Sequence, residues 1–221
     1  MSEESAHQVP IPWSRPSVVK ELLGRQRLTL VLTVFLIELT IFFLAASVPL
    51  DAATQQLLQK EAKGLTRASS SSGPAAELVY IFTHNTVIAF GEMVPVVGSL
   101  LWAVSIYATG QVVQAVASSH GAPGALYGLF LLFFPFALVE LAAYAVAVSS
   151  GVTLIIAWRQ RRLRNEVKML VLEGGVVATM LLTAAAMETV TITDPTLGIT
   201  LWIPTGLTIA VLTLISSRLW H

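Results

Sequence analysis

The chain has 221 residues, of which 55% are hydrophobic and only 12% are charged, and its mean hydropathy is +0.74. A soluble domain carries roughly a quarter charged residues, so this composition excludes an ordinary water-soluble protein and predicts an all-α, polytopic membrane protein. The formal net charge is zero and cysteine is absent, which argues against a nucleic-acid partner and excludes disulfides and thiolate metal sites.

The first 27 residues predict a cytoplasmic tail that leads into an amphipathic helix at the membrane surface. Residues 13–27 carry apolar side chains at helical spacing, and Lys20, Arg25 and Arg27 lie at the rim of that apolar face. This pattern is typical of a helix lying on an anionic leaflet. We therefore expect these three basic residues to bind lipid or a partner protein.

Residues 28–221 predict a single transmembrane domain of about six helices, because its apolar runs are long enough to cross a hydrocarbon core of about 30 Å. The expected spans are residues 28–50, 77–92, 95–117, 125–157, 167–190 and 197–219. The polar, Ser-rich stretch 51–76 predicts an extracytoplasmic loop with one short amphipathic helix around residues 57–65.

Two positions predict interruptions within apolar sequence. The run from 77 to 118 is too long for one span and contains Gly91 and Pro95 near its centre, so we expect two helices joined by a tight turn or break. Pro135 lies inside the fourth run and leaves the carbonyl group of Leu131 without its helical donor. We expect that helix to be kinked or discontinuous near Pro135.

The distribution of basic residues predicts the orientation. Short cytoplasmic loops are enriched in Lys and Arg, and six spans with both termini inside place ten of the 13 basic residues on the cytoplasmic side. The densest cluster, in the loop before the fifth span, contains Arg159, Arg161, Arg162 and Arg164. We expect a multi-pass cell-membrane protein with both termini cytoplasmic, and this cluster to contact lipid or a partner.

Several ionisable or polar residues fall within the predicted spans. Glu38 and Glu140 are the most central, and His84, Asn85 and the break at Pro135 complete a candidate intramembrane polar site. A lone carboxylate in hydrocarbon costs a few kcal/mol, so each needs a proton, a hydrogen bond or water. The site is either a proton or solute pathway or a set of interhelical hydrogen bonds.

Three further glutamates lie near the ends of predicted spans, where exposure to the interface lowers the free-energy cost of a charged group: Glu92, Glu173 and Glu188. No Lys or Arg lies in the middle of a predicted span, so none of the intramembrane glutamates has an obvious cationic partner. The sequence therefore predicts acids that are neutral or hydrogen-bonded rather than ion-paired.

The sequence carries no recognisable signature of catalysis or of metal binding. The chain has no GxSxG, P-loop or HExxH motif and no His pair at ligand spacing. We therefore predict no catalytic residue, no metal site and no cofactor. Three functions stay open: a non-enzymatic scaffold or subunit of a membrane complex, a transporter subunit coupled to a separate ATPase, and an intramembrane enzyme.

Several short motifs occur in an order that resembles the stage II sporulation protein M family of integral membrane proteins. The resemblance extends over roughly residues 28–195 and is carried by the following positions: Phe82-Thr83-His84-Asn85, Gly98, Gly110, Pro135, Glu140, the basic run 159–164, Glu188 and Pro195. Phe136 and Ala137 stand where the family's proline is usually followed by His and Gly, and a third-span Asn is replaced around Ala108 and Thr109.

The resemblance implies a scaffold role, because the sporulation member anchors hydrolytic partners in a membrane complex that remodels peptidoglycan. It implies membrane-protein or cytoplasmic partners besides the bilayer and leaves a homo-oligomer open. Family members also occur in organisms that do not sporulate, so the resemblance does not assign a sporulation role to this chain.

Overall fold

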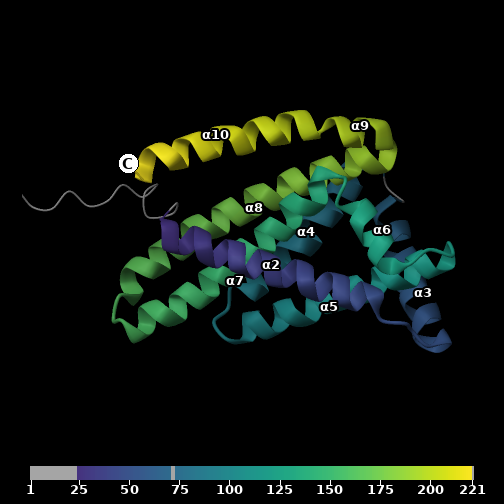
Figure 1. The fold of residues 1–221 in the computed structure, drawn as a ribbon, viewed down its shortest axis with the longest axis horizontal. Helices are drawn as coiled ribbons and strands as arrows, with labels where there is room; N and C mark the ends of the chain where they lie inside the picture. Colours follow the sequence, from purple (N-terminus) through teal and green to yellow (C-terminus); the bar gives the residue numbers. More distant parts are fainter. Residues whose placement is uncertain (1–23, 71–72, 221) are drawn as a thin grey trace, which may run out of the picture.

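The computed structural model describes residues 24–70 and 73–220, and the predicted tail and most of the interfacial helix lie outside these residues. The described part contains nine helices and no strand (Figure 1). The helices are α2 (Arg25–Ser47), α3 (Ala52–Ser70), α4 (Pro74–Glu92), α5 (Val97–Ser119), α6 (Gly124–Leu131), α7 (Pro135–Arg159), α8 (Leu163–Thr193), α9 (Pro195–Thr200) and α10 (Trp202–Trp220).

Four helices are long and apolar enough to cross a membrane, namely α2, α5, α7 and α8. Their length and composition confirm the predicted class, an all-helical membrane protein. The predicted span 77–92 corresponds to α4, and the predicted span 197–219 corresponds to α9 followed by α10. Whether these segments also cross the bilayer stays a prediction.

Helix α7 forms the centre of the bundle and contacts α2, α4, α5 and α8 (Figure 1). Its alanines Ala143, Ala145 and Ala147 are fully buried. A side chain at Gly151 would place its Cβ 2.9 Å from the carbonyl oxygen of Met93. Small residues therefore let the neighbouring helices approach the α7 backbone closely, as is usual where helices pack inside a membrane.

The fourth apolar run is discontinuous, as predicted. Helix α6 ends at Leu131, and Pro135 starts α7 as its first residue, where the missing N–H leaves no intrahelical bond unmade. The Leu131 carbonyl accepts a hydrogen bond from the Phe134 amide at 3.1 Å, and the Phe133 carbonyl accepts one from the Trp202 indole at 2.6 Å. The backbone carbonyl groups of Leu131 and Phe133 at the break thus accept hydrogen bonds, one from within the same segment and one from α10.

The turn between α4 and α5 confirms the second predicted interruption. It follows Glu92 and contains Val96 in the left-handed region, at φ 67°. A Cβ at Gly98 would lie only 2.0 Å from the carbonyl oxygen of Glu92, so only glycine allows the chain to fold back so tightly. The turn therefore fixes the end of α4, and with it Glu92, against the bundle.

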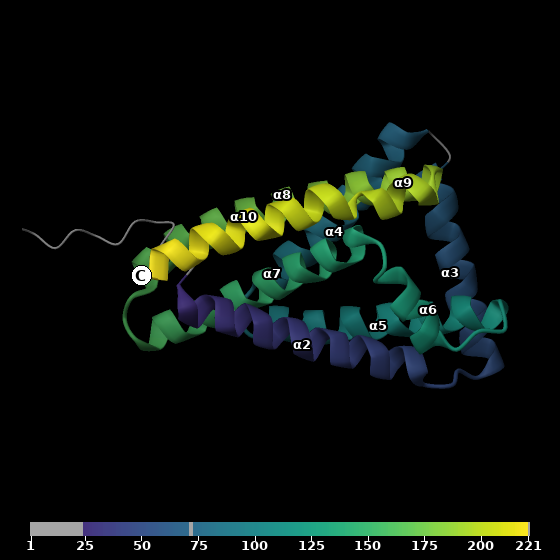
Figure 2. The ribbon, with the colours of Figure 1, turned by 45° about the horizontal axis from the view of Figure 1, so that its top comes forward.

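The short helix predicted around residues 57–65 within the stretch 51–76 is longer than expected, because Ala52–Ser70 form the continuous helix α3. Asp51 starts it by accepting hydrogen bonds from the amides of Ala53 and Thr54, each at 3.0 Å. The side chain of Gln59 donates to the carbonyl of Ala115 at 2.9 Å, which ties α3 to α5. Helix α3 lies across one end of the bundle (Figure 2).

Candidate intramembrane carboxylate site

Glu38 lies near the middle of α2 and is completely buried. Neither of its carboxyl oxygens has a hydrogen-bond partner. The indole nitrogen of Trp102, on α5, also lacks a partner, and it lies close enough to act on the Glu38 carboxyl group. The sequence-predicted position at the centre of a span is therefore a polar group enclosed by protein.

Glu92 is the last residue of α4, at the end of the predicted span, and it is 1% exposed, so its carboxyl group is enclosed by protein. The hydroxyl group of Ser105 donates a hydrogen bond to Oε1 of Glu92 at 2.8 Å, whereas Oε2 has no partner. One sign of this burial is visible in the sequence. A glycine such as Gly98, a few residues after the turn, indicates that a backbone carbonyl approaches closely.

Glu140 lies on α7, five residues after the break, and is half-buried. The hydroxyl group of Tyr144, one helical turn later, donates to Oε1 of Glu140 at 3.1 Å. On the same face of α7, Ala143, Ala147 and Gly151 are all buried. This face is turned toward the neighbouring helices.

These three glutamates, here called the central carboxylate cluster, come from α2, α4 and α7. Glu38 interacts electrostatically with both Glu92 and Glu140, and Tyr144 interacts with all three. On the other side of Glu140, the carboxyl group of Glu188 interacts with it and with Glu77. The fold thus gathers acids that are far apart in the sequence.

The structure does not bring His84 to this cluster. Its side chain is exposed on α4 and stacks on Tyr80, with ring centroids 6.1 Å apart. Asn85, the next residue, is buried at 8% exposure. Pro135 is also fully buried, at the start of α7. Of the predicted polar site, the fold brings Glu38 and Glu140 within electrostatic reach of each other.

A second group of buried acids lies at the beginning of α2. Arg27 donates to the carboxylates of Glu166 and Glu173, both on α8, and its side chain is only 15% exposed. The prediction that Glu173 has no cationic partner was therefore wrong. Glu166 and Glu173 are seven residues apart and so share one face of a helix, a signal that could have indicated a common partner.

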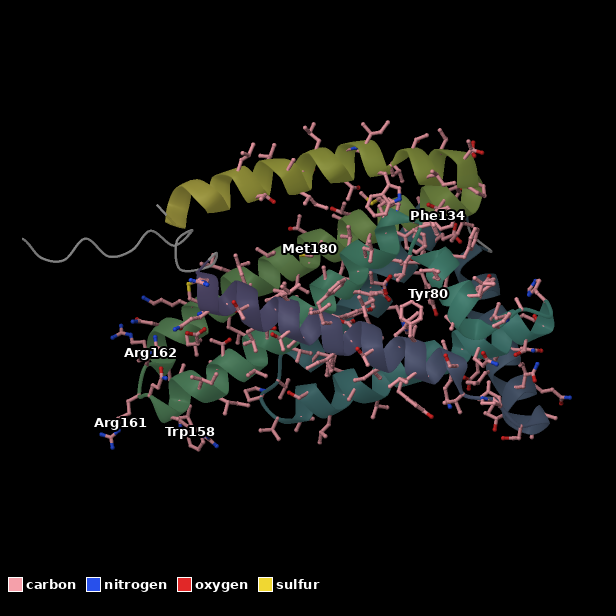
Figure 3. The ribbon with its side chains drawn as sticks, in the orientation of Figure 1. Tyr80, Phe134, Trp158, Arg161, Arg162 and Met180 are labelled. Atoms are coloured by element: carbon pink, nitrogen blue, oxygen red, sulfur yellow. The ribbon has the colours of Figure 1, made fainter. Side chains whose placement is uncertain are left out.

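The basic run of the turn between α7 and α8 lies at the same end of the molecule as Arg27 (Figure 3). Arg159, Arg161, Arg162 and Arg164 are exposed around the turn between α7 and α8, and Figure 3 shows Arg161 and Arg162 pointing outward beside Trp158. A cavity of about 550 Å³ at the start of α2 is lined by Arg25, Arg27 and Arg162 together with polar neighbours. Lys20 lies outside the described residues.

Among residues 24–70 and 73–220, no three or more His, Asp or Glu side chains are arranged to hold a metal ion. The central carboxylate cluster is surrounded instead by hydrogen-bond donors, from Trp102, Ser105 and Tyr144.

Comparison with known proteins gave one match. The family model described as Stage II sporulation protein M matches residues 29–193, which run from the first turns of α2 to the end of α8. No curated protein and no solved structure matches the chain significantly.

Proposed function

The chain belongs to the stage II sporulation protein M family, and on that premise we propose that it acts as a membrane scaffold, a non-enzymatic subunit of a larger complex. Its partners are other membrane or cytoplasmic proteins. The apolar helices support residence in a membrane, and the family supports assembly into a complex.

The observation that carries this proposal is a groove of about 550 Å³ on the outside of the bundle. It runs between the turn after α4 and one face of α8, where Gly174, Gly175 and Ala178 line it. A Cβ at Gly175 would meet nothing within 4 Å, so this glycine is not required by packing inside the chain. Small residues on a lipid-facing helix allow a partner helix to approach closely.

The experiment compares copurification in mild detergent from the native host. Gly175→Leu fills the groove without an internal clash, and we expect it to lose a partner that the wild-type chain retains. Thr183→Leu is the matched control, because Thr183 is exposed on the same helix outside the groove. Equal recovery of every partner by wild type and Gly175→Leu would contradict the groove as the assembly surface.

A transporter subunit is the second candidate, and the central carboxylate cluster is the observation that favours it. Buried acids without a cation are typical of ion and proton paths in membrane proteins. A separate ATPase would couple through the basic turn between α7 and α8. Solute or proton flux in proteoliposomes, measured with wild type and Glu140→Gln, separates this function from the scaffold.

We further propose six crossings with both termini in the cytoplasm, in which α4 and the α9–α10 segment complete the set. Ten of 13 basic residues then lie on the inner side, and only Lys60, Lys63 and Arg67 lie outside. Single cysteines at Ser5, Ser70 and Gln160 test this with an impermeant reagent on intact cells. Only the Ser70 position is expected to react, and labelling at Gln160 would overturn the orientation.

A further inference from the structure

The central carboxylate cluster holds more acid groups than the surrounding protein can neutralise. Each charged group found to act on Glu38 is another acid, Glu92 or Glu140. Among the described residues, Arg27 is the buried cation nearest to Glu38 in the sequence, and it is paired with Glu166 and Glu173 instead. The cluster therefore lacks the ion pairing that stabilises buried carboxylates elsewhere in the bundle.

Full ionisation of such a cluster is unfavourable for two reasons. An isolated carboxylate moved out of water loses many kcal/mol of hydration, and like charges that share a site repel one another. Glu38 makes no hydrogen bond that would offset this loss, and Glu92 makes one, from Ser105. Proteins answer this situation by keeping one or more of the acids protonated.

An independent observation points to the same ligand. Trp102 is 8% exposed, its indole nitrogen has no hydrogen-bond partner, and it is directed at the Glu38 carboxyl group. The hydroxyl groups of Ser105 and Tyr144 donate to the other two acids. These donors are neutral, so they supply no charge that would offset the charge of the acids, and a bound proton removes that charge directly.

We propose that the central carboxylate cluster is a proton-binding site, in which Glu38, Glu92 and Glu140 share protons that they take up and release. Among residues 24–70 and 73–220, the groups found to act on it are acids or neutral donors: Trp102 and Ser105 from α5, Tyr144 from α7, and Glu188 from α8 with Glu77 beyond it. Proton binding goes beyond the scaffold role and does not depend on any partner.

Infrared spectroscopy of the purified full chain in lipid nanodiscs tests this site, because a protonated carboxyl group has a carbonyl absorption distinct from that of a carboxylate. At neutral pH we expect a protonated-carboxyl band that decreases as the pH rises. Glu38→Gln should lose the contribution of one acid. Glu61→Gln, an exposed acid on α3, is the matched control and should leave the band unchanged.

Trp102→Phe adds a positional test, since it removes the indole donor and keeps every acid. The protonated-carboxyl band should shift in frequency without losing area. If Glu38→Gln does not fold, Glu92→Gln carries the same expectation. A spectrum without a protonated-carboxyl band at neutral pH would overturn the proposal, as would loss of the band on adding sodium ions at constant pH. Copurification plays no part here, so this result is separate from the scaffold test.

Discussion

Two groups of buried glutamates in this protein have the same side chain and opposite surroundings. At the beginning of α2, Glu166 and Glu173 share the guanidinium group of Arg27. In the central carboxylate cluster, Glu38 and Glu92 are at least as deeply buried but have no cation among the groups found to act on them. Burial alone therefore does not decide what a glutamate does in this bundle. Its neighbours decide whether it holds helices together or holds a proton.

The paired group has the geometry of a structural lock. A guanidinium group presents several N–H donors in one plane, which allows Arg27 to bind two carboxylates one above the other on α8. The contact fixes the start of α2 against α8, although the two helices are far apart in the sequence. The unpaired group gathers acids from α2, α4 and α7, but its hydrogen bonds come from the neutral hydroxyl groups of Ser105 and Tyr144. Since no cation fixes its charge, it retains the capacity to change that charge.

The largest effect is expected from Arg27→Leu, which leaves two buried carboxylates without their cation. Removing one partner of a buried ion pair destabilises by about 3–5 kcal/mol. The free energy of unfolding, measured in mixed detergent micelles, should fall by this amount. Arg159→Leu is the control, because Arg159 is exposed on α7. Equal free energies of unfolding for Arg27→Leu and Arg159→Leu would show that Arg27 does not stabilise Glu166 and Glu173 as a buried ion pair.

A combined variant sharpens the same contrast. Arg27→Met with Glu166→Gln and Glu173→Gln removes the charges together, and replacing a whole buried ion-pair group is often neutral. Its free energy of unfolding should lie closer to wild type than that of Arg27→Leu. A combined variant less stable than the single one would show that Arg27 acts by packing rather than by pairing.

The next effect concerns the turn that positions Glu92. Gly98→Ala places a Cβ against the carbonyl of Glu92, and overpacking of this kind costs about 1–3 kcal/mol. Since no charge changes, the variant displaces one acid of the central cluster and leaves the Arg27 group intact. Gly64→Ala, in open space on α3, should be neutral or stabilising. Unfolding of both variants in the same micelles provides the measurement.

The sequence predicted those features that depend on local pattern. Long apolar runs gave the four membrane-length helices, and Pro135 and Pro95 marked the two interruptions, because proline and apolar length act within one segment. The length of the polar helix α3 was underestimated, because Gly64 and the Ser-rich end favour a loop when this segment is considered alone. Its contacts with α5 and α4 overrode that weak local preference.

The site was predictable only in part, for the same reason. Glu38 and Glu140 could be chosen because their depth follows from their position within an apolar run. The pairing of Arg27 with Glu173, and the burial of Glu92, depend on which helices become neighbours. No spacing within one helix encodes that adjacency, so both were missed.

A smaller effect is expected at Glu140, whose carboxyl group accepts from Tyr144. Glu140→Gln keeps an acceptor of the same shape and should cost about 1 kcal/mol or less. Glu140→Leu leaves the buried Tyr144 hydroxyl without that acceptor and should cost about 1–3 kcal/mol. Thermal stability of both variants in detergent tests this. Wild-type stability of Glu140→Leu would show that the Tyr144 contact contributes nothing to the fold.

The smallest effect provides the water-exposed reference for both groups. Asp51 lies between α2 and α3, fully exposed, and hydrogen bonds from the hydroxyl and then the amide of Thr54 lower its pKa below the ordinary value. A lowered folded-state pKa means that the ionised cap stabilises α3 above the unfolded value, near 4. This contribution is lost as the pH falls through the folded-state pKa. Hydrogen bonds from neutral donors at an exposed site, rather than a neighbouring cation, keep this carboxylate charged.

Thr54→Val removes the hydroxyl donor and retains the amide, so the Asp51 pKa should rise part of the way toward its ordinary value. Carbon-13 NMR of the Asp51 carboxyl group across acidic pH measures the shift directly. Asp51→Asn serves as the control for α3, because an amide oxygen accepts the same backbone bonds without titrating. Equal midpoints in wild type and Thr54→Val would mean that the Thr54 hydroxyl does not hold the charge. The three environments therefore differ in what accompanies the acid. Exposed hydrogen-bond donors accompany Asp51, Arg27 accompanies Glu166 and Glu173, and a proton accompanies the central carboxylate cluster.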